Sequence, residues 1–465
     1  MRFNFLAHTP RLAGVLIAAV LVVGCTDTQE TADGRGTIRG LHAIPDLGAV
    51  TFLIEETRVP PNGGQINYLS ATPTDEYDAL TYDFNFDFTS GQTREVTRLL
   101  STEVSVAVDT SYTFVLHGQA TAPQITVLDT PIREFGAADT VLELWFANFS
   151  QQVGPVDFYL GDEGLDPAAN TPLATNVAPA TATTVVEIET QLSEFVVTPA
   201  GDPATILMRS EVTTLSAQNT LLVTLLDSAG EVNGDFVLSI SGEGLTNAVA
   251  VDDRALPTVQ FSNASAASGA IDIYRTSDLT TPLVADLAVG EITAPIEIPE
   301  GDDLGTLELT FTPMGNVGVI LEQEEFSFSN GRNTVGLFAG RQAEDNAAFV
   351  QLPLSRRTLF DAAQFGLYNA ILDTTRVDFY LIEEDETLET DSPRAGNLPS
   401  LFEVEAVTLP PETLDVVVTD TSDNGVLAGP LELTLAAGDI VRVVLVDTSD
   451  PTQAEIVILR PLTAQ

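Results

Sequence analysis

The chain repeats one pattern four times, and a repeat of fixed period constrains the fold more than any other feature of the sequence. In each copy a His or Asn is followed eight positions later by a β-branched residue, which is Val50, Val156, Ile271 or Val377. These anchors recur at intervals of 106, 115 and 106 residues, close to the roughly 100 residues of a small β-sandwich domain. The aligned segments, which we call opening motifs, are His42–Leu53, Asn148–Tyr159, Asn263–Tyr274 and Asn369–Tyr380. We therefore expect four domains of one kind.

Each repeat contains apolar runs of strand length. Around the second opening motif, Leu142–Phe146 and Val156–Leu160 lie on either side of a polar loop, which predicts two strands. About sixty residues after each anchor comes a further pair of apolar runs joined by a turn rich in Gly, Asp, Asn or Pro. These pairs are Tyr112–Leu116 with Ile125–Leu128, Leu221–Leu226 with Phe236–Ile240, Val335–Phe338 with Phe349–Leu352, and Ile440–Val446 with Ile456–Leu459.

Between these pairs the sequence alternates with a period of two, as in Tyr82–Phe88, which predicts half-buried strands with Phe84, Phe86 and Phe88 on one face. Helical periodicity is scarce, and 26 Pro and 33 Gly interrupt the chain at regular places. The predicted fold class is all-β, a tandem array of four immunoglobulin-like antiparallel β-sandwich domains. The array could be a rod or a compact block.

The repeat positions also set the expected domain boundaries. We expect a leader at residues 1–24 and a tether at 25–36, because the latter segment is polar and contains glycine. The four β-sandwich repeats are then expected at residues 37–135, 136–254, 255–358 and 359–465.

The leader has the features of a bacterial lipoprotein signal peptide. Arg2 and Arg11 precede an apolar run, Leu12–Gly24, that is shorter than the roughly 20 residues of a membrane-spanning helix. The run ends in Val-Val-Gly before Cys25, which resembles the lipobox, and Cys25 is the only cysteine in the chain. We therefore expect cleavage after residue 24 and lipid modification of Cys25, which would hold the protein at a membrane.

The residue after the cysteine bears on the destination. Thr26 stands there rather than Asp. By resemblance to Gram-negative lipoproteins, the lack of Asp favours transfer to the outer membrane, on its periplasmic or surface-facing side. The lipid on Cys25 is thus the expected partner contact with the membrane.

Charge excludes one class of partner. The chain has 67 Asp and Glu against 19 basic residues, all of them Arg, and a formal net charge of −48. Nucleic acid is not expected as a partner, because a polyanion repels phosphate and clustered Lys and Arg are absent. We interpret the acids mainly as a solvated surface suited to salt water, rather than as specific cation sites.

The opening motifs resemble a family of bacterial surface proteins known only as a domain of unknown function, whose repeats begin with a pattern like H-A-S-P-D-A-P-x-V-D-V-Y. The first copy matches its beginning at His42-Ala43 and Pro45-Asp46. The other three match its ending, as in Val156-Asp157-Phe158-Tyr159, but have Asn in place of His and lack the loop proline. The resemblance implies an exported, β-rich protein built from repeats and implies no activity.

The sequence offers little catalytic chemistry. It has no Lys, and after removal of the leader only His42 and His117 remain, which disfavours zinc sites and catalytic triads. His42 occupies the slot that Asn148, Asn263 and Asn369 occupy in the other repeats, and we expect this slot to stabilise a loop by hydrogen bonds. We expect no cofactor and no enzymatic activity. A glycoside hydrolase that uses two carboxylates remains the alternative from another class.

Repeated and clustered acids are the remaining candidates for a site. Asp157, Asp272 and Asp378 stand at equivalent positions and could form a ligand stripe, although outward positions of strands are the preferred interpretation. Calcium is a second possibility, with candidate ligands at Asp302, Asp303, Asp420 and Asp423. The predicted function is a non-enzymatic cell-envelope lipoprotein with a structural, binding or adhesive role. A glycan, calcium or a protein could be its ligand.

Overall fold

The computed structural model describes most of the chain after the tether. The described residues are 34–59, 64–189, 192–242, 247–265, 267–298, 306–340, 347–372, 376–383, 387–388, 391–448 and 453–461. The expected signal peptide, Cys25 and the tether up to residue 33 lie outside these ranges. Within them, no helix has the length and apolar character needed to cross a bilayer.

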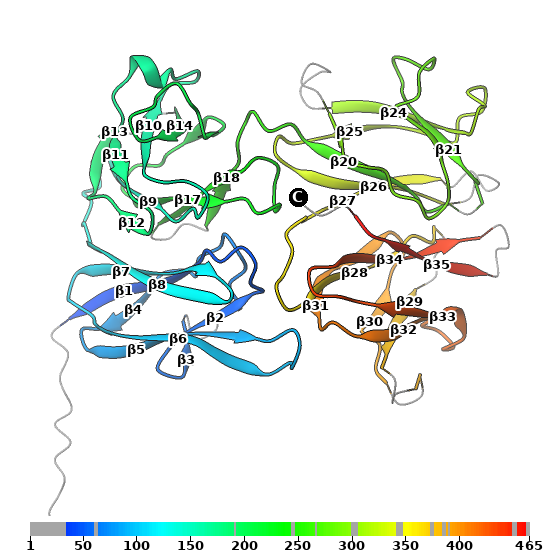
Figure 1. The fold of residues 1–465 in the computed structure, drawn as a ribbon, viewed down its shortest axis with the longest axis horizontal. Helices are drawn as coiled ribbons and strands as arrows, with labels where there is room; N and C mark the ends of the chain where they lie inside the picture. The colour runs from blue at the N-terminus through cyan, green and yellow to red at the C-terminus, as the bar shows by residue number, and fades with distance from the viewer. Residues whose placement is uncertain are drawn as a thin grey trace, which may run out of the picture.

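The described strands form four two-sheet sandwiches, called units 1 to 4, as Figure 1 shows. Unit 1 contains β1 (Arg35–His42), β2 (Val50–Ile54), β3 (Thr57–Arg58), β4 (Asp75–Asp78), β5 (Thr81–Thr89), β6 (Val96–Ser105), β7 (Thr110–Gln119) and β8 (Ala122–Pro131). Unit 2 contains β9 (Val141–Asn148), β10 (Val156–Gly161), the 3₁₀ turn η1 (Pro167–Ala169), β11 (Ala174–Val177), β12 (Thr181–Ala182), β13 (Val186–Glu189), β14 (Leu192–Pro199), β15 (Met208–Arg209), β16 (Thr213–Thr214), β17 (Thr220–Asp227), β18 (Phe236–Gly242) and β19 (Ala248–Ala250).

The second half of the chain repeats this plan. Unit 3 contains β20 (Thr258–Asn263), β21 (Ile271–Arg275), β22 (Val284–Leu287), β23 (Ile296–Glu297), β24 (Thr306–Pro313), β25 (Glu322–Ser327), β26 (Asn333–Ala339) and β27 (Ala348–Pro353). Unit 4 contains β28 (Ala363–Asn369), β29 (Val377–Ile382), β30 (Ala395–Leu398), β31 (Phe402–Leu409), β32 (Thr413–Asp420), β33 (Val426–Thr434), β34 (Ile440–Asp447) and β35 (Ala454–Leu459). The predicted fold class, an all-β array of four sandwiches, is confirmed.

Each unit has an inner and an outer sheet. The inner sheets have the orders β4-β1-β7-β8, β12-β9-β17-β18-β19 with β13 also on β9, β23-β20-β26-β27, and β31-β28-β34-β35. The outer sheets have the orders β3-β2-β5-β6, β11-β10-β14-β15 with β16 also on β14, β22-β21-β24-β25, and β30-β29-β32-β33.

One strand pair in every unit departs from the predicted antiparallel arrangement. The first strand of each inner sheet pairs in parallel with a strand from the end of the unit: β1 with β7, β9 with β17, β20 with β26, and β28 with β34. The reason is the path of the chain, which leaves the inner sheet at the loop of the opening motif, passes through the outer sheet and returns in the same direction. The other pairings between the named strands are antiparallel.

The period-two pattern places the cores as expected. Phe84 and Phe86 are fully buried, and Phe52 and Phe114 stack on them between the two sheets of unit 1. Asn85 lies on the opposite face of β5 and is also buried, because its side-chain amide donates to the backbone oxygen of Glu55 at 2.6 Å. The wet face expected of this strand is therefore partly covered by the adjacent turn.

The inner sheets of units 1 and 2 face each other, so their outward sides are buried too. Leu41 and Val115 of unit 1 pack there with Ala147, Phe149 and Leu222 of unit 2. Units 3 and 4 repeat this contact, where Val335, Leu337, Tyr368 and Val444 are buried together. Each pair of units is thus a stack of four sheets, called block 1–2 and block 3–4, at the left and the right of Figure 1.

The two blocks lie side by side and enclose the linker between units 3 and 4, residues 354–362. Within this linker, the N–H of Phe360 donates to the oxygen of Asp46 in unit 1 at 2.9 Å. The N–H of Arg356 donates to the oxygen of Gly230 in unit 2 at 2.8 Å. The array of four units is therefore compact and not a rod (Figure 1).

Candidate functional site

The slot held by His or Asn braces the loop that follows the first strand of each unit. His42, Asn148, Asn263 and Asn369 are all fully buried. His42 donates from Nε2 to Gly48 O at 3.0 Å and accepts at Nδ1 from Ile44 N at 3.3 Å. Burial, and then the charge of Arg357, lower the pKa of His42 to about 3, so the ring is neutral. A neutral imidazole offers one donor and one acceptor.

The Asn residues make the same kind of bonds. Asn148 donates to Gly154 O at 2.9 Å and accepts from Ser150 N at 3.2 Å, so its partners lie six and two positions further along. Asn263 repeats this with Gly269 O at 2.7 Å and Ser265 N at 3.0 Å. A side-chain amide, like a neutral imidazole, offers a donor and an acceptor. The residue in this slot therefore fixes the conformation of the loop, and its polar groups are used for that purpose.

The repeated aspartates alternate along their strands with the core residues Phe158, Ile273 and Phe379, as predicted, but they are not exposed as outward positions would be. Asp157, Asp272 and Asp378 are 5%, 5% and 7% exposed. Asp157 accepts from the backbone N–H groups of Asn176 and Gly201 at 2.7 and 2.8 Å. These aspartates neither form a ligand stripe nor contact water as outward strand positions would.

A β-bulge explains their burial. The pairing of β10 with β11 shifts between Val156 and Phe158, opposite Asn176, and the same shift recurs where β21 meets β22 and β29 meets β30. An extra residue in a bulge leaves an N–H without a partner in the ladder. Asp272 and Asp378 accept those N–H groups, from Asp286 at 2.8 Å and Asn397 at 2.6 Å. The signature aspartate therefore caps a bulge.

The calcium candidates do not converge. Asp420 and Asp423 lie in the β32–β33 turn, where each carboxylate accepts a backbone N–H two positions ahead, from Ser422 at 2.7 Å and Gly425 at 2.8 Å. The bond from Ser422 lowers the pKa of Asp420. Asp302 and Asp303 lie outside the described residues. Among the residues that the structure describes, no three His, Cys, Asp or Glu are grouped to hold a metal ion.

A cleft of about 840 Å³ opens between unit 1 and unit 4 and is the main candidate site. One wall is the β5–β6 turn of unit 1, where Asp361 of the linker accepts from Gly91 N at 2.8 Å and from Ser90 Oγ at 3.3 Å. A Cβ on Gly91 would lie 2.5 Å from the Cβ of Ala362, so only glycine permits this approach. The turn and the linker thus form a closed, hydrogen-bonded wall.

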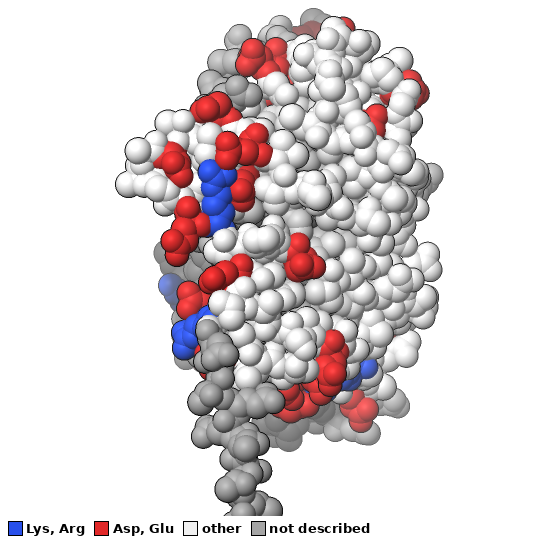
Figure 2. Space-filling view, turned by 90° about the vertical axis from the view of Figure 1, so that its left-hand side faces the viewer, with Lys and Arg blue, Asp and Glu red and all other residues white. Residues whose placement is uncertain are grey.

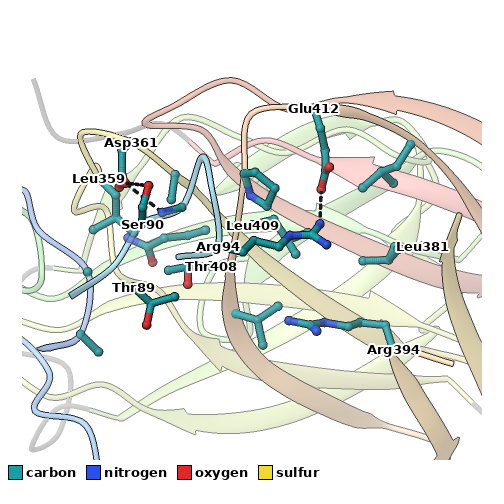
Figure 3. A pocket seen from close by; sticks show the side chains of 18 of the residues that line it. Thr89, Ser90, Arg94, Leu359, Asp361, Leu381, Arg394, Thr408, Leu409 and Glu412 are labelled. Atoms are coloured by element: carbon teal, nitrogen blue, oxygen red, sulfur yellow. Dashed lines mark hydrogen bonds and ion pairs between the residues drawn. The ribbon is translucent and has the colours of Figure 1, made fainter. Parts of the chain in front are cut away.

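Three arginines line this cleft, and Figure 3 labels two of them, Arg94 and Arg394. Arg94 of unit 1 forms ion pairs with Glu383 at 2.7 Å and Glu412 at 3.2 Å, both from unit 4, and the bond to Glu383 raises the pKa of Arg94. Arg394 reaches in from the turn before β30, and its guanidinium makes no hydrogen bond or ion pair within the described residues. With respect to the described residues, the guanidinium of Arg394 therefore still has all its donors available for a ligand.

The rest of the lining combines polar and apolar side chains. Hydroxyl and amide side chains are contributed by Gln65, Asn67, Thr89, Ser90, Gln364, Ser392 and Thr408. Apolar contact comes from Phe88, Leu359, Leu381, Leu409 and Leu414. Such a surface can bind a hydroxylated ligand through several hydrogen bonds and hold an anionic group at Arg394.

Arg357 fixes the floor of the cleft and ties the units together. Its guanidinium donates to the backbone oxygens of Pro45 and Leu47, each at 2.9 Å. It also forms an ion pair with Glu231 of unit 2 at 3.3 Å and lies 5.2 Å above the ring of Tyr68. A residue of the linker between units 3 and 4 therefore binds units 1 and 2 at once.

Comparison with known proteins gives one family. Residues 36–159 match the family described as a domain of unknown function (DUF4397), which is unit 1 together with β9 and the first residues of β10. No curated protein matches the chain. Among solved structures, the Bacillus anthracis TIE protein is similar at 11% identity, over 85% of this chain and 68% of that chain, with a TM-score of 0.15. That score is too low to support any argument.

Sequence reasoning did not find the cleft. Its charged residues come from a turn of unit 1, the linker before unit 4 and two connections within unit 4, β29–β30 and β31–β32. Arg94, Asp361 and Arg394 lie outside every opening motif and share no pattern. The one sequence signal for such a site is the scarcity of basic residues, because several Arg side chains close together stand out in a chain with 67 acidic residues.

Proposed function

We propose that the protein is a non-enzymatic lipoprotein of the cell envelope that binds a hydroxylated, anionic ligand, such as an acidic saccharide, in the cleft between units 1 and 4. The observation that carries this proposal is Arg394, whose guanidinium has no partner among the described residues and lies in a cleft lined by hydroxyl and amide groups. A volume of about 840 Å³ is within the range of roughly 300 to 1,000 Å³ that is common for small-ligand sites.

A binding role fits the carboxylates of the cleft better than hydrolysis does. Asp361 accepts from Gly91 and Ser90, and Glu383 and Glu412 pair with Arg94. Asp391 accepts from the N–H of Ser392 at 2.7 Å. A glycosidase needs one carboxyl group as acid and a second as base or nucleophile. Here these four carboxylates serve contacts that hold the walls in place.

The ligand proposal is tested by calorimetric titration with oligomers of a uronic acid and with neutral oligomers of the same length. We expect the acidic oligomers to bind more tightly than the neutral ones. Arg394→Gln should weaken their binding about tenfold or more, since a hydrogen bond to a charged group contributes about 1.5 to 3 kcal/mol. The matched control is Arg58→Gln, which removes an exposed Arg outside the cleft and should change binding less than twofold. An equal loss of affinity in both variants would mean that only the net charge of the protein matters. Absence of binding by either oligomer would refute the proposal.

We also propose that Cys25 carries the lipid and that the chain resides at the outer membrane. The support is the single cysteine after an apolar leader, with Thr26 behind it. Labelling with a fatty acid analogue should mark the wild-type chain, and Cys25→Ser should abolish the label and release the protein from the membrane fraction. A labelled Cys25→Ser chain would place the lipid elsewhere.

A further inference from the structure

The two blocks of the molecule contact each other through unlike ends. The first strand of each unit begins at what we call the start end and finishes at the motif end, where the loop of the opening motif lies. In unit 1 the motif end docks on the linker of block 3–4 through Asp46 and Gly91. In unit 2 the turn after β17, at its motif end, contacts the start end of unit 3, where Asn233 N donates to Gly331 O at 2.7 Å. The motif end of block 1–2 thus binds the start end of block 3–4.

A contact between unlike ends leaves one end of each kind free. Because β20 begins beside the unit 2 contact and runs away from it, the motif end of unit 3 lies on the side away from block 1–2. The start end of block 1–2 lies on the opposite side, at the left of Figure 1, where the teal trace joins β8 to β9, and no described residue of block 3–4 contacts it. One motif end and one start end are thus buried in the contact between the blocks, and a second motif end and a second start end have no described segment over them.

The free motif end of unit 3 presents an apolar turn. The β24–β25 turn, residues 313–321, contains no charged residue, and its side chains Met314, Val317 and Ile320 are 54%, 45% and 54% exposed. In a chain of net charge −48, an uncharged turn with three exposed apolar side chains is unusual.

This turn is also held in place. Gly315 N donates to the buried carboxylate of Asp272 at 2.8 Å, and Met314 N donates to Ala270 O at 3.0 Å. Leu321 N closes the turn on Phe311 O at 2.8 Å. The apolar side chains are thus displayed on a fixed backbone, which reduces the entropy lost when a partner binds.

The equivalent turns of units 1 and 2 show what such a turn does. In unit 1 the β5–β6 turn carries Gly91 and Arg94 and docks on the linker before unit 4. In unit 2 the residues Ile206 and Leu207 line the cleft that faces unit 3. The unit 3 turn ends in the same residue pair, Ile320-Leu321, but here Ile320 is more than half exposed.

The free start end offers a matching surface. The linker between units 1 and 2, residues 132–140, occupies the place that residues 354–362 occupy in block 3–4, and Gly136, Ala137 and Ala138 are exposed along it, between the acidic residues Glu134 and Asp139. Figure 2 looks at this end of the molecule: acidic side chains lie along the left edge, with others near the centre, at the bottom and at the upper right, and uncharged areas lie between them. Because the turn 313–321 carries no charge, it can approach these small side chains closely and adds no carboxylate to those of the linker.

We propose that the partner is a second copy of this chain, bound head to tail, with the unit 3 turn 313–321 of one copy on the 132–140 linker of the next. The contact repeats between copies the arrangement that the blocks already make within one. Because the two surfaces differ, each copy keeps one free end, and the assembly is an open chain and not a closed dimer. Salt favours it, since the screening length is only about 8 Å at about 0.15 M ionic strength.

The test uses the chain from residue 25 onward with Cys25→Ser, so that no acyl group contributes to association. Sedimentation velocity over a range of concentrations should show growing oligomers, more of them as salt increases. Val317→Asp with Ile320→Asp should weaken association at least tenfold and leave the melting temperature unchanged. The matched control is Val426→Asp, at a side chain of unit 4 that is 55% exposed, and it should associate like the parent.

A mixing experiment tests the polarity of the contact. Ala137→Asp with Ala138→Asp should also abolish self-association, because it blocks the receiving end. Mixed in equal amounts, the two blocked variants should form heterodimers and nothing longer, since each retains the end that the other lacks. A parent chain that stays monomeric at every concentration, a Val426→Asp effect equal to that of the turn variant, or a mixture without heterodimers would overturn the proposal.

Discussion

The two kinds of contact between units differ in chemistry. Within each block, apolar faces of two inner sheets meet, and Val115, Ala147 and Leu222 are fully buried between units 1 and 2. Between the blocks, the contacts centred on the linker residues 354–362 are mainly hydrogen bonds and ion pairs, as at Arg357 and Asp361, together with an aromatic contact between Phe88 and Phe360. Apolar interfaces resemble a domain core cut in half and are obligate, whereas polar ones permit relative motion. The difference indicates that each block folds as one unit and that the blocks then dock.

The strongest test removes the apolar contact within a block. Leu222→Asp places a charge in the core shared by units 1 and 2, and we expect a loss of more than about 4 kcal/mol in the free energy of unfolding. Trp145, the only tryptophan, is buried in the same core and reports its unfolding by fluorescence in a urea titration. Leu222→Met is the control and should cost less than about 1.5 kcal/mol. Similar midpoints for both variants would contradict an obligate block.

A smaller effect is expected when the contact between blocks is broken. Arg357→Ala removes the bonds to Pro45 and Leu47 and the ion pair with Glu231, and should weaken docking by about 2 kcal/mol. Small-angle X-ray scattering should show a larger radius of gyration, while the urea midpoint reported by Trp145 stays unchanged. Arg357→Lys keeps the charge but not the forked donor geometry, and its radius of gyration should lie between those of the wild type and Arg357→Ala. An unchanged radius would show that the blocks are held by other contacts.

Substitution of His42 tests whether the residue that fixes the loop can be exchanged between units. His42→Ala leaves Gly48 O and Ile44 N without partners and should cost about 1 to 3 kcal/mol. His42→Asn installs the residue of the other three units and should cost much less. A loss as large for Asn as for Ala would show that the His ring itself is required.

The same pair of variants has a pH signature. His42 has its pKa lowered from 6.5 to about 3 in the folded state, so below about pH 6.5 the unfolded chain binds a proton that the folded chain does not. Stability of the wild type should therefore fall as pH decreases from about 6.5 toward 3. His42→Asn should lack this part of the pH dependence in thermal melts. Parallel curves for the two proteins would contradict the assignment.

The smallest effect concerns the polar contact between units 2 and 3. Burial and the neighbouring Asp252 raise the pKa of Asp253 from 3.8 to about 6. The folded state therefore holds this proton more tightly, and stability should fall as pH rises from about 4 through about 6. Asp253→Asn removes the penalty and should raise the melting temperature by about 1 to 2 °C at pH 7 and not at all below pH 4. A gain that is independent of pH would point to another cause.

The sequence predicted local features well and contacts between units poorly. Alternation placed Phe84 and Phe86 in the core, because a period of two is a property of a single strand. Alternation also assigned Asp157 to the outer face, but only the paired strand β11 shows that a bulge lies over it. For the cleft, Arg94 and Arg394 carry no motif and are 300 positions apart, so nothing in the sequence relates them.

The sequence by itself determined the number of repeats and their β class, and it predicts a lipid anchor at Cys25. These features depend on periodicity, on turn residues and on a short apolar run before a cysteine, all of which act over a few neighbouring residues. Only the tertiary structure decided that inner sheets are buried on both sides, that two blocks close around one linker, and that a cleft holding the guanidinium of Arg394 lies between the first unit and the last. Those features depend on which surfaces of distant segments fit together, and shape and charge complementarity are properties of the folded chain.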